Sequence, residues 1–261
     1  MTTEGSAGVA VVTGGASGIG AACCRVLASR GARVAVLDRD AARARDVAEE
    51  VGGTALIADV GDEASIEAAA AEIEANFGPV EILVNSAGII QLPQRPTELS
   101  MERYDQIVNI DQRGTYLACV VFARRMLPRR RGSIVNIASI AGMRALPLHA
   151  YSPAKAAVIS MTGCLAAEWG PAGIRVNAVS PGYTRTPALQ SAIDRGERDV
   201  SLLERNSALG RLVDPDEIAK AVAFLVSAEA SAITGINLPV DCGWLAAAPW
   251  TTYGGLRNSE D

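Results

Sequence analysis

The feature that most constrains this fold is a series of short apolar segments that alternate with longer helical patterns. Most of the segments are continuously apolar rather than alternating, which is typical of strands buried on both faces of a parallel sheet. We predict strands at residues 9–12, 33–37, 54–58, 81–85, 133–137, 175–179 and 236–240, and helices at 18–30, 41–51, 63–77, 101–127, 151–169 and 216–227. This alternation predicts an α/β fold, a Rossmann-like doubly wound parallel sheet of about seven strands flanked by helices.

The 261 residues show no linker, charge block or low-complexity run that would divide them. We therefore expect one domain, 1–261, for both dinucleotide binding and catalysis. Residues 184–213 interrupt the alternation with Pro187, Gly196 and Gly210, which predicts an irregular substrate-binding loop. The tail, 244–261, carries Trp250 and Tyr253, and could cover a pocket, reach a neighbouring subunit or remain loose.

The charge balance argues against a nucleic-acid partner. The chain has 24 Lys and Arg against 29 Asp and Glu, a net charge of −5, whereas a nucleic-acid binder normally carries a basic surface. No apolar run approaches the ~20 residues needed to cross a bilayer, and the first residues lack the pattern of a secretory signal. We expect a cytoplasmic protein with no membrane partner and reduced thiols, and no metal site, because the single histidine has no ligating partner.

A glycine-rich turn follows the first predicted strand and opens the first helix. Gly14, Gly18 and Gly20 let the turn close tightly, so that amides at the helix N-terminus face a pyrophosphate. Asp38 ends the second strand, where a carboxylate can accept both hydrogen bonds of an adenosine ribose and repels a 2′-phosphate. The sequence thus favours NAD over NADP, although Arg39 could meet a phosphate. Asp59 follows the third strand, where it could reach the adenine amino group or belong to a helix cap.

Together with these motifs, the chain resembles the short-chain dehydrogenase/reductase family, in its single-domain branch. The resemblance rests on motifs in the family's order: the turn from Thr13 to Gly20, Asn85-Ser86-Ala87-Gly88, Asn109, Ser139, Tyr151-Ser152-Pro153-Ala154-Lys155, Pro181-Gly182 and the closing Leu238-Pro239-Val240-Asp241-Cys242-Gly243. Two positions depart from the family pattern, because Ser86 replaces a second Asn and Cys242 replaces a Gly. The cofactor-binding set that the motifs and the resemblance indicate is Gly14, Ser17, Gly18, Ile19, Gly20, Asp38, Arg39, Asp59, Val60, Asn85, Ala87, Gly88, Tyr151, Lys155, Pro181, Gly182, Thr184 and Thr186.

Tyr151 and Lys155 are the expected catalytic pair. They lie four residues apart on a helix, so their side chains share one face. A nearby ammonium favours the phenolate form, which makes a tyrosine usable as an acid/base near neutral pH. Ser139 can hold the substrate oxygen while charge develops on it. The resemblance adds that Lys155 also bonds the nicotinamide ribose, and that Asn109 interrupts a helix and holds a water linking Lys155 to solvent.

The substrate side of the site is less defined by the sequence. We expect Ile90, Leu146, His149, Tyr183 and Gln190 to contribute, with Ile89 and Leu92 near them. This mixture does not choose between a polyol and an apolar ketone, and His149 could merely rim the pocket.

These features predict an NAD-dependent oxidoreductase that transfers a hydride between nicotinamide and a small secondary alcohol or ketone. Two alternatives stay open: an NADPH-dependent ketoreductase resembling the 3-oxoacyl reductases, and a non-catalytic dinucleotide-binding regulator. The resemblance also implies a homotetramer, or a homodimer, assembled through the long helices and the closing strand. Small residues along 151–169 would permit close helix packing, between subunits or within one.

Overall fold

Strand β1 (Val9–Thr13) is buried along its whole length, as expected of a strand covered on both faces. We describe residues 8–197 and 199–256 of a computed structural model. The strands form one parallel sheet in the order β3-β2-β1-β4-β5-β6-β7. The other strands are β2 (Arg33–Asp38), β3 (Thr54–Ile57), β4 (Val80–Asn85), β5 (Gly132–Ile137), β6 (Ile174–Pro181) and β7 (Asn237–Val240). The predicted fold class is confirmed, and each predicted strand forms within two residues of its expected bounds.

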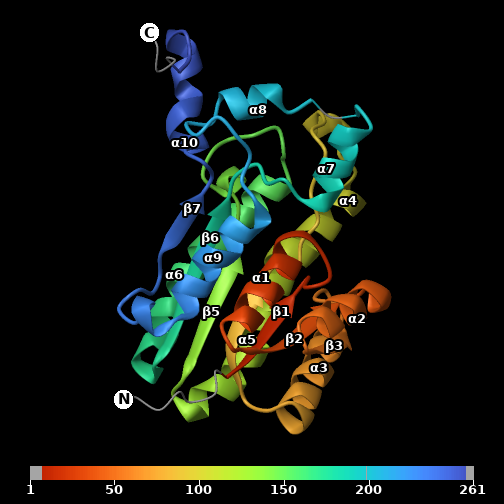
Figure 1. The fold of residues 1–261 in the computed structure, drawn as a ribbon, viewed down its shortest axis with the longest axis vertical. Coiled ribbons are helices and arrows are strands. Elements are labelled where there is room, and N and C mark those ends of the chain that lie inside the picture. The colour runs from red at the N-terminus through yellow and green to blue at the C-terminus, as the bar shows by residue number, and fades with distance from the viewer. Residues whose placement is uncertain (1–7, 198, 257–261) are drawn as a thin grey trace.

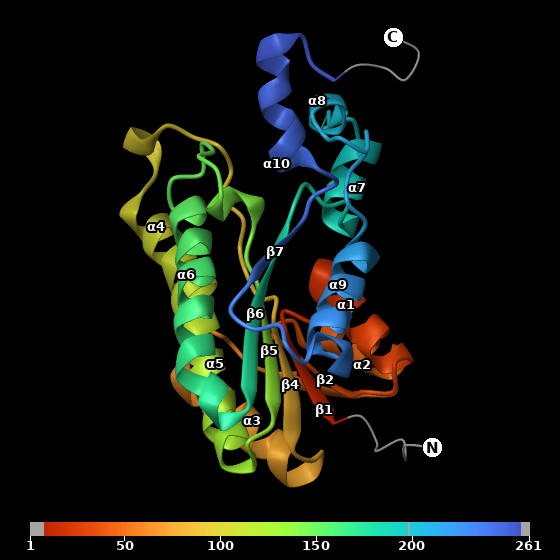
Figure 2. The ribbon, with the colours of Figure 1, turned by 90° about the vertical axis from the view of Figure 1, so that its left-hand side faces the viewer.

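Helices cover both faces of this sheet (Figures 1 and 2). On one face α1 (Gly18–Ser29), α2 (Ala41–Glu50) and α9 (Pro215–Val226) close an apolar core. On the other face α3 (Glu63–Asn76), α5 (Thr115–Met126) and α6 (Tyr151–Trp169) close a second core around Phe122. Figure 2 shows the sheet edge-on between these two layers. Single 3₁₀ turns lie at Pro96–Glu98, Leu127–Arg129, Ile140–Gly142, Gly170–Ala172, Ala228–Ala230 and Ala248–Tyr253.

The helix predicted over 101–127 is not continuous. It divides into α4 (Met101–Ile107), a π-helical segment (Val108–Gly114) and α5. A π-helix widens the turn, and such segments often mark functional sites. Here the segment packs against α6, which carries the predicted catalytic pair.

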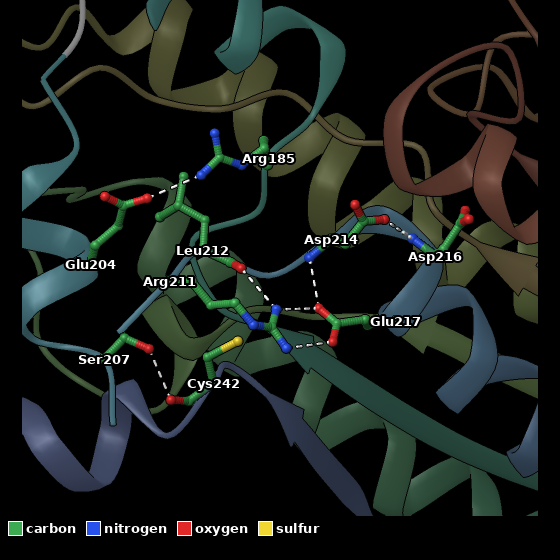
Figure 3. A network of polar contacts seen from close by, with 9 residues as sticks. All are labelled: Arg185, Glu204, Ser207, Arg211, Leu212, Asp214, Asp216, Glu217 and Cys242. Atoms are coloured by element: carbon green, nitrogen blue, oxygen red, sulfur yellow. Dashed lines mark hydrogen bonds and ion pairs between the residues drawn. The ribbon is translucent and has the colours of Figure 1, made fainter. Parts of the chain in front are cut away.

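The predicted irregular loop at 184–213 contains two short helices, α7 (Pro187–Asp194) and α8 (Ser201–Arg205). Thr186 caps α7 through its hydroxyl, and Pro187 occupies the first turn, where its missing N–H costs nothing. Figure 3 shows how this insertion is fastened. Arg185 pairs with Glu204 at 3.0 Å, and Arg211 forms a bidentate pair with Glu217 of α9 at 2.7 Å.

The tail begins as α10 (Trp244–Ala247), whose first residue packs edge-on against Tyr183 with ring centroids 5.4 Å apart. Beyond it, Trp250 and Tyr253 are 51% and 91% exposed. The start of the tail is therefore held against the insertion, and its aromatic end projects away from the sheet (Figure 2). A separate finding is that none of the helices in the described ranges has both the length and the apolar character to cross a membrane.

Candidate active site

A cleft of about 1070 Å³ opens at the carboxyl edge of the sheet. The strand order reverses between β1 and β4, and parallel sheets of this kind open a crevice outside the strand ends at such a point. The cleft is lined by the glycine turn, by the residues after β2 to β6, by the first turn of α6 and by parts of α7. These segments are far apart in sequence and meet only through the sheet.

The glycine turn fits closely against its neighbours. Gly14 has φ +65°, and a Cβ there would lie 2.6 Å from Cα of Ala87. A Cβ on Gly20 would collide with the carbonyl oxygen of Gly14. Both positions therefore need glycine, and the turn keeps the approach that a pyrophosphate requires. Gly14, Ser17, Gly18 and Ile19 line the cleft, whereas Gly20 supports the turn from behind.

The Asp38 carboxylate lies against this turn. One of its oxygens accepts a hydrogen bond from the Ala16 N–H at 3.1 Å, and the other accepts from the Asp40 N–H at 3.0 Å. Asp38 and Arg39 both line the cleft, together with Arg43. An anionic group is thus held in a defined orientation where the sequence places the adenosine ribose.

Asp59 and Val60 line the next part of the cleft. Asp59 accepts from the Gly61 N–H at 2.8 Å in a local turn, while Asp62 caps α3 by accepting from the Ala64 N–H. The helix cap is therefore Asp62, and Asp59 lies at the cleft. Ala87, Gly88, Pro181, Gly182, Thr184 and Thr186 line it as well.

Asn85 lies beneath the cleft rather than in its lining. Its amide donates to Oδ1 of Asn136 at 2.9 Å, and Asn136 in turn donates to Thr162 of α6 at 3.0 Å. Cys119 of α5 completes this buried polar cluster through its sulfur. The side chain of Asn85 thus ties β4 to β5 and α6, so that the helix bearing Tyr151 is fixed to the sheet.

Ser139, Tyr151 and Lys155 line one end of the cleft. Lys155 Nζ lies 5.5 Å from the centroid of the Tyr151 ring and donates to the Ile137 carbonyl at 3.1 Å. Ser139 follows β5, and its hydroxyl accepts from the Ala141 N–H. The spacing of four residues therefore places ammonium and phenol on one helix face, as predicted, with a hydroxyl from another element in the same cavity.

Gln91 is a site residue that sequence reasoning missed. Its Oε1 accepts from the N–H groups of Ala150 at 2.8 Å and Tyr151 at 3.2 Å, so it caps α6 from a loop 60 residues earlier. No local pattern signals such a contact. Gln91 is buried, and it fixes the first turn of the helix that carries Tyr151 and Lys155.

The helix residue that reaches Lys155 is Asp111, not Asn109. Asp111 Oδ1 lies 3.2 Å from Lys155 Nζ, and the Asp111 side chain is fully buried. Asn109 instead accepts from Arg113 at 3.4 Å and faces Gly61. Asn109 does lie in the segment that interrupts the helix, as expected, but its side chain bonds Arg113 and the direct partner of Lys155 is Asp111. A sequence signal existed, because Asp111 lies four residues after Ile107 and four before Thr115, a charged residue on a buried stripe.

Burial and charge act in opposite directions on this pair. Burial raises the pKa of the Asp111 carboxyl above its ordinary value, against the attraction of Lys155 and the hydrogen bond from Ile89. Burial acts to lower the pKa of Lys155, but the Coulomb attraction of Tyr151 and Asp111 outweighs it and raises that pKa. Lys155 is therefore a cation at neutral pH, although it is only 4% exposed.

The substrate end of the cleft is partly as predicted. Ile90, Leu146 and Tyr183 line it, together with Ile89 and Leu92. His149 lies instead in a neighbouring shallow pocket beside Leu146 and Ser152. Gln190 is held outside the lining, because it accepts from Arg185 at 3.0 Å and donates to Asp194 at 2.6 Å.

Comparison with known proteins shows which family has a sequence similar to this chain. A family model described as enoyl-(acyl carrier protein) reductase matches residues 14–245. The chain is 42% identical to D-threitol dehydrogenase of Mycolicibacterium smegmatis, over 90% of this chain and 92% of that one. It is also 42% identical to galactitol 2-dehydrogenase (L-tagatose-forming) of Cereibacter sphaeroides, over 90% of this chain and 94% of that one.

A crystal structure described as ribose-5-phosphate isomerase from Brucella melitensis 16M is similar over 98% of this chain and 99% of that one. It shares 54% identity with this chain and superposes with a TM-score of 0.94. The family match and the two dehydrogenases together cover the glycine turn, the Tyr151 helix and the closing strand. This chain therefore belongs to the short-chain dehydrogenase/reductase family.

Proposed function

We propose that this protein is an NAD-dependent dehydrogenase that interconverts a secondary alcohol of a small polyol and the corresponding ketone. The observation that carries the proposal is the shared cleft. It joins the glycine turn and Asp38 at one end to Ser139, Tyr151 and Lys155 at the other. The names of the two dehydrogenase relatives support a polyol as the substrate class.

The residues present fit a nicotinamide dinucleotide. The turn at Gly14 and Gly18 leaves backbone exposed where a Cβ would fill the space or strain the chain. The turn amides would hold the pyrophosphate, Asp38 the adenosine ribose, and Lys155 the nicotinamide ribose. When bound, this cofactor supplies the hydride acceptor for alcohol oxidation.

The protein's own residues handle the proton. Ser139 would donate a hydrogen bond to the substrate oxygen, and Tyr151 would take the hydroxyl proton during oxidation and return it during reduction. Lys155 holds its ammonium 5.5 Å from the centroid of the phenol ring, where it would stabilise negative charge that develops on the phenol oxygen as the proton moves. Gln91 positions Tyr151 by capping its helix.

Replacement of Tyr151 by Phe tests this assignment. The variant keeps the ring, so we expect folding and NAD binding to persist, while polyol oxidation followed by NADH absorbance falls by at least about 100-fold, a typical acid/base contribution. Retention of turnover at neutral pH would refute the role of Tyr151. Tight NAD binding without oxidation of any polyol in the wild type would instead favour a non-catalytic regulator.

Asp38 supports NAD as the cofactor, because a carboxylate repels the 2′-phosphate of NADP. Arg39 and Arg43 line the same part of the cleft and favour the alternative, an NADPH-dependent ketoreductase. Initial rates with NAD and NADP, in wild type and in Asp38→Ser, separate the two. We expect the wild type to prefer NAD and the variant to gain activity with NADP, whereas a wild type that prefers NADP would refute the proposal.

Ribose-5-phosphate isomerase is an activity of a different class that is named among the similar proteins. Within the described residues, the cations lining the cleft are Arg39 and Arg43 at the Asp38 end and Lys155 in its ion pair. Arg39 and Arg43 lie at the opposite end of the cleft from Tyr151, and the charge of Lys155 is matched by Asp111, so no unpaired cation among the described lining residues is left for a phosphate beside Tyr151. Incubation with ribose 5-phosphate, with and without NAD, tests this alternative, and formation of a ketose phosphate without NAD would overturn our proposal.

We also propose that the protein assembles through the outer face of α6. Ala156 and Ala167 are exposed there, and a Cβ added to Gly163 would meet nothing within 4 Å in the same chain. Close approach of a helix from a second copy would use this space. Sedimentation of the wild type and of Gly163→Trp tests it: the wild type should form tetramers or dimers that the variant weakens.

A further inference from the structure

The lysine that neighbours the Tyr151 ring forms an ion pair with Asp111, whose Oδ1 lies 3.2 Å from Lys155 Nζ. Asp111 comes from the π-helical segment and Lys155 from α6, and their side chains are 0% and 5% exposed. Charges that are buried act on their neighbours far more strongly than charges in water. The ammonium that lies 5.5 Å from the centroid of the Tyr151 ring is therefore paired with a buried carboxylate.

The Asp111 carboxylate is held by more than its ion pair. Its two oxygens lie 3.3 and 3.2 Å from the Ile89 N–H, and its own backbone carbonyl accepts from the Thr115 hydroxyl at 2.9 Å. A Cβ on Gly88 would lie 2.5 Å from Oδ1, so the chain before Ile89 closes tightly over the carboxylate. This geometry favours an acceptor that is ionised and fixed in place.

The charged and titratable groups that surround the pair are few. Among the described residues, Tyr151 acts on Lys155 from the same helix, α6, and Arg103 of α4 acts on Asp111 from farther away. Arg103 itself is bound to the Ile90 carbonyl and to Gln106. From β5, the contact to the ion pair is the neutral carbonyl of Ile137, which accepts a hydrogen bond from Lys155.

We propose that Asp111 is a positioning residue that holds Lys155 in the site and, as a carboxylate, offsets part of its charge, so that Tyr151 becomes a base at higher pH than it would beside Lys155 alone. The inference rests on the proposed function for its kinetic consequence. The expected effect on Tyr151 follows from the summed charges of Lys155 and residue 111. A neutral residue at 111 would leave the lysine charge uncompensated, while the carboxylate brings the sum of the pair to zero.

The first variant is Asp111→Asn, which keeps the shape and an acceptor for Lys155 while removing the charge. We expect the rising limb of the pH profile for alcohol oxidation to move to lower pH by about one unit, since removing a buried charge near the phenol changes its ionisation by an amount of this order. Asp105→Asn is the matched control. Asp105 is exposed on α4, so solvent screens its charge and its loss should leave the profile unchanged.

A second measurement needs no substrate. The pH dependence of phenolate absorbance is recorded for the cofactor-free protein, and the same titration of Tyr151→Phe is subtracted to isolate Tyr151. We expect the half-point of this difference to lie at lower pH in Asp111→Asn than in the protein with Asp111. Because the titration is independent of turnover, it still tests Asp111 if no polyol is oxidised, in which case only the proposed function fails.

Comparison of Asp111→Ala with Asp111→Asn separates the two roles of Asp111, which are to hold Lys155 in place and to offset its charge. Asp111→Ala removes the acceptor as well, so NAD affinity and turnover should both fall, by roughly tenfold or more, whereas Asp111→Asn should keep NAD affinity within about twofold. A purely structural role would lower activity in both variants without moving the pH profile. An unchanged or upward shift in Asp111→Asn would overturn the proposal. So would failure of both Asp111→Asn and Asp111→Ser to fold, because the carboxylate would then be a requirement of the fold.

Discussion

Removal of Asn136 should destabilise the fold far more than removal of an exposed amide. Asn136 is fully buried on β5, where it accepts from Asn85 at 2.9 Å, donates to Thr162 at 3.0 Å and accepts from the sulfur of Cys119 at 3.3 Å. Each buried hydrogen bond contributes about 1 kcal/mol net, and a buried donor left without a partner costs about 1 to 3 kcal/mol more. In Asn136→Ala, the amide of Asn85 keeps only a weak sulfur acceptor.

The expected loss in the free energy of unfolding is therefore about 2 to 4 kcal/mol, a large part of the 5 to 15 kcal/mol typical of a domain. Urea unfolding followed by circular dichroism, at one fixed protein concentration, measures it. Asn76→Ala at the exposed end of α3 is the control and should cost well under 1 kcal/mol.

A double-mutant cycle with Asn85→Ala should show a coupling of at least about 0.5 kcal/mol, because the two amides share one hydrogen bond. A loss in Asn136→Ala no larger than that of the exposed control would show that the cluster does not hold α6 to the sheet. Strictly additive losses in the cycle would show the same for the Asn85 contact.

Three further changes test other contacts. Gly88→Ala would place a Cβ 3.4 Å from Lys155 Nζ and closer still to its carboxylate partner, so turnover should fall at least about tenfold with little change in the circular dichroism spectrum. Gln91→Leu leaves two buried N–H groups at the start of α6 unpaired, which should cost about 1 to 3 kcal/mol in urea unfolding. The hydrogen bond from Arg211 lowers the pKa of Glu217 to about 2. The pair therefore stabilises the fold fully at pH values above the ordinary glutamate pKa, and this stabilisation is lost as the pH falls toward 2. The stability difference between wild type and Glu217→Gln should accordingly shrink over that interval, and a difference that grows on acidification would contradict the pairing.

Elements set by local pattern could be predicted closely. Most of the strands are largely apolar runs, so their positions follow from the local sequence pattern, and α6 begins and ends at Tyr151 and Trp169 as expected. The parallel arrangement then brings the strand ends to one edge without further information. This is why Asp38 and Ser139, which follow two different strands, were correctly expected to lie at the cleft with the glycine turn.

Asn109 shows where such reasoning stops. The resemblance predicts an interruption of the helix at Asn109, and seven residues from Val108 to Gly114 do adopt a π-helix, but the pattern does not show how far this segment turns the residues after it. Each π-turn contains more residues than an α-turn, so the residues that follow rotate relative to an ideal helix. Which side chain faces Lys155 therefore depends on the defect, and the defect is stabilised by packing against α6 rather than by local propensity.

Gln91 and Asn85 were missed or misplaced for a related reason. Gln91 caps a helix 60 residues later, and Asn85 bonds a residue 51 positions away. A polar residue in a loop or at a strand end is compatible with many partners, and only the three-dimensional arrangement selects one. Likewise, the sequence shows that Cys242 replaces a glycine of the family pattern, but not which backbone conformation the residue adopts. Cys242 has φ +52°, a conformation that costs a non-glycine residue about 1 kcal/mol.

The buried lysine explains why these missed contacts gather around the catalytic helix. A cation that is only 4% exposed must be matched within the protein, since an unpaired buried charge costs several kcal/mol. The Ile137 carbonyl supplies a dipole and Asp111 supplies the opposite charge, while Gln91 and Thr162 fix the helix on which the lysine lies. The strand ends thus determine where the cofactor and substrate would lie. The buried partners of Lys155 set the charge that surrounds Tyr151, and our proposal for Asp111 requires that its charge can be removed without loss of the fold.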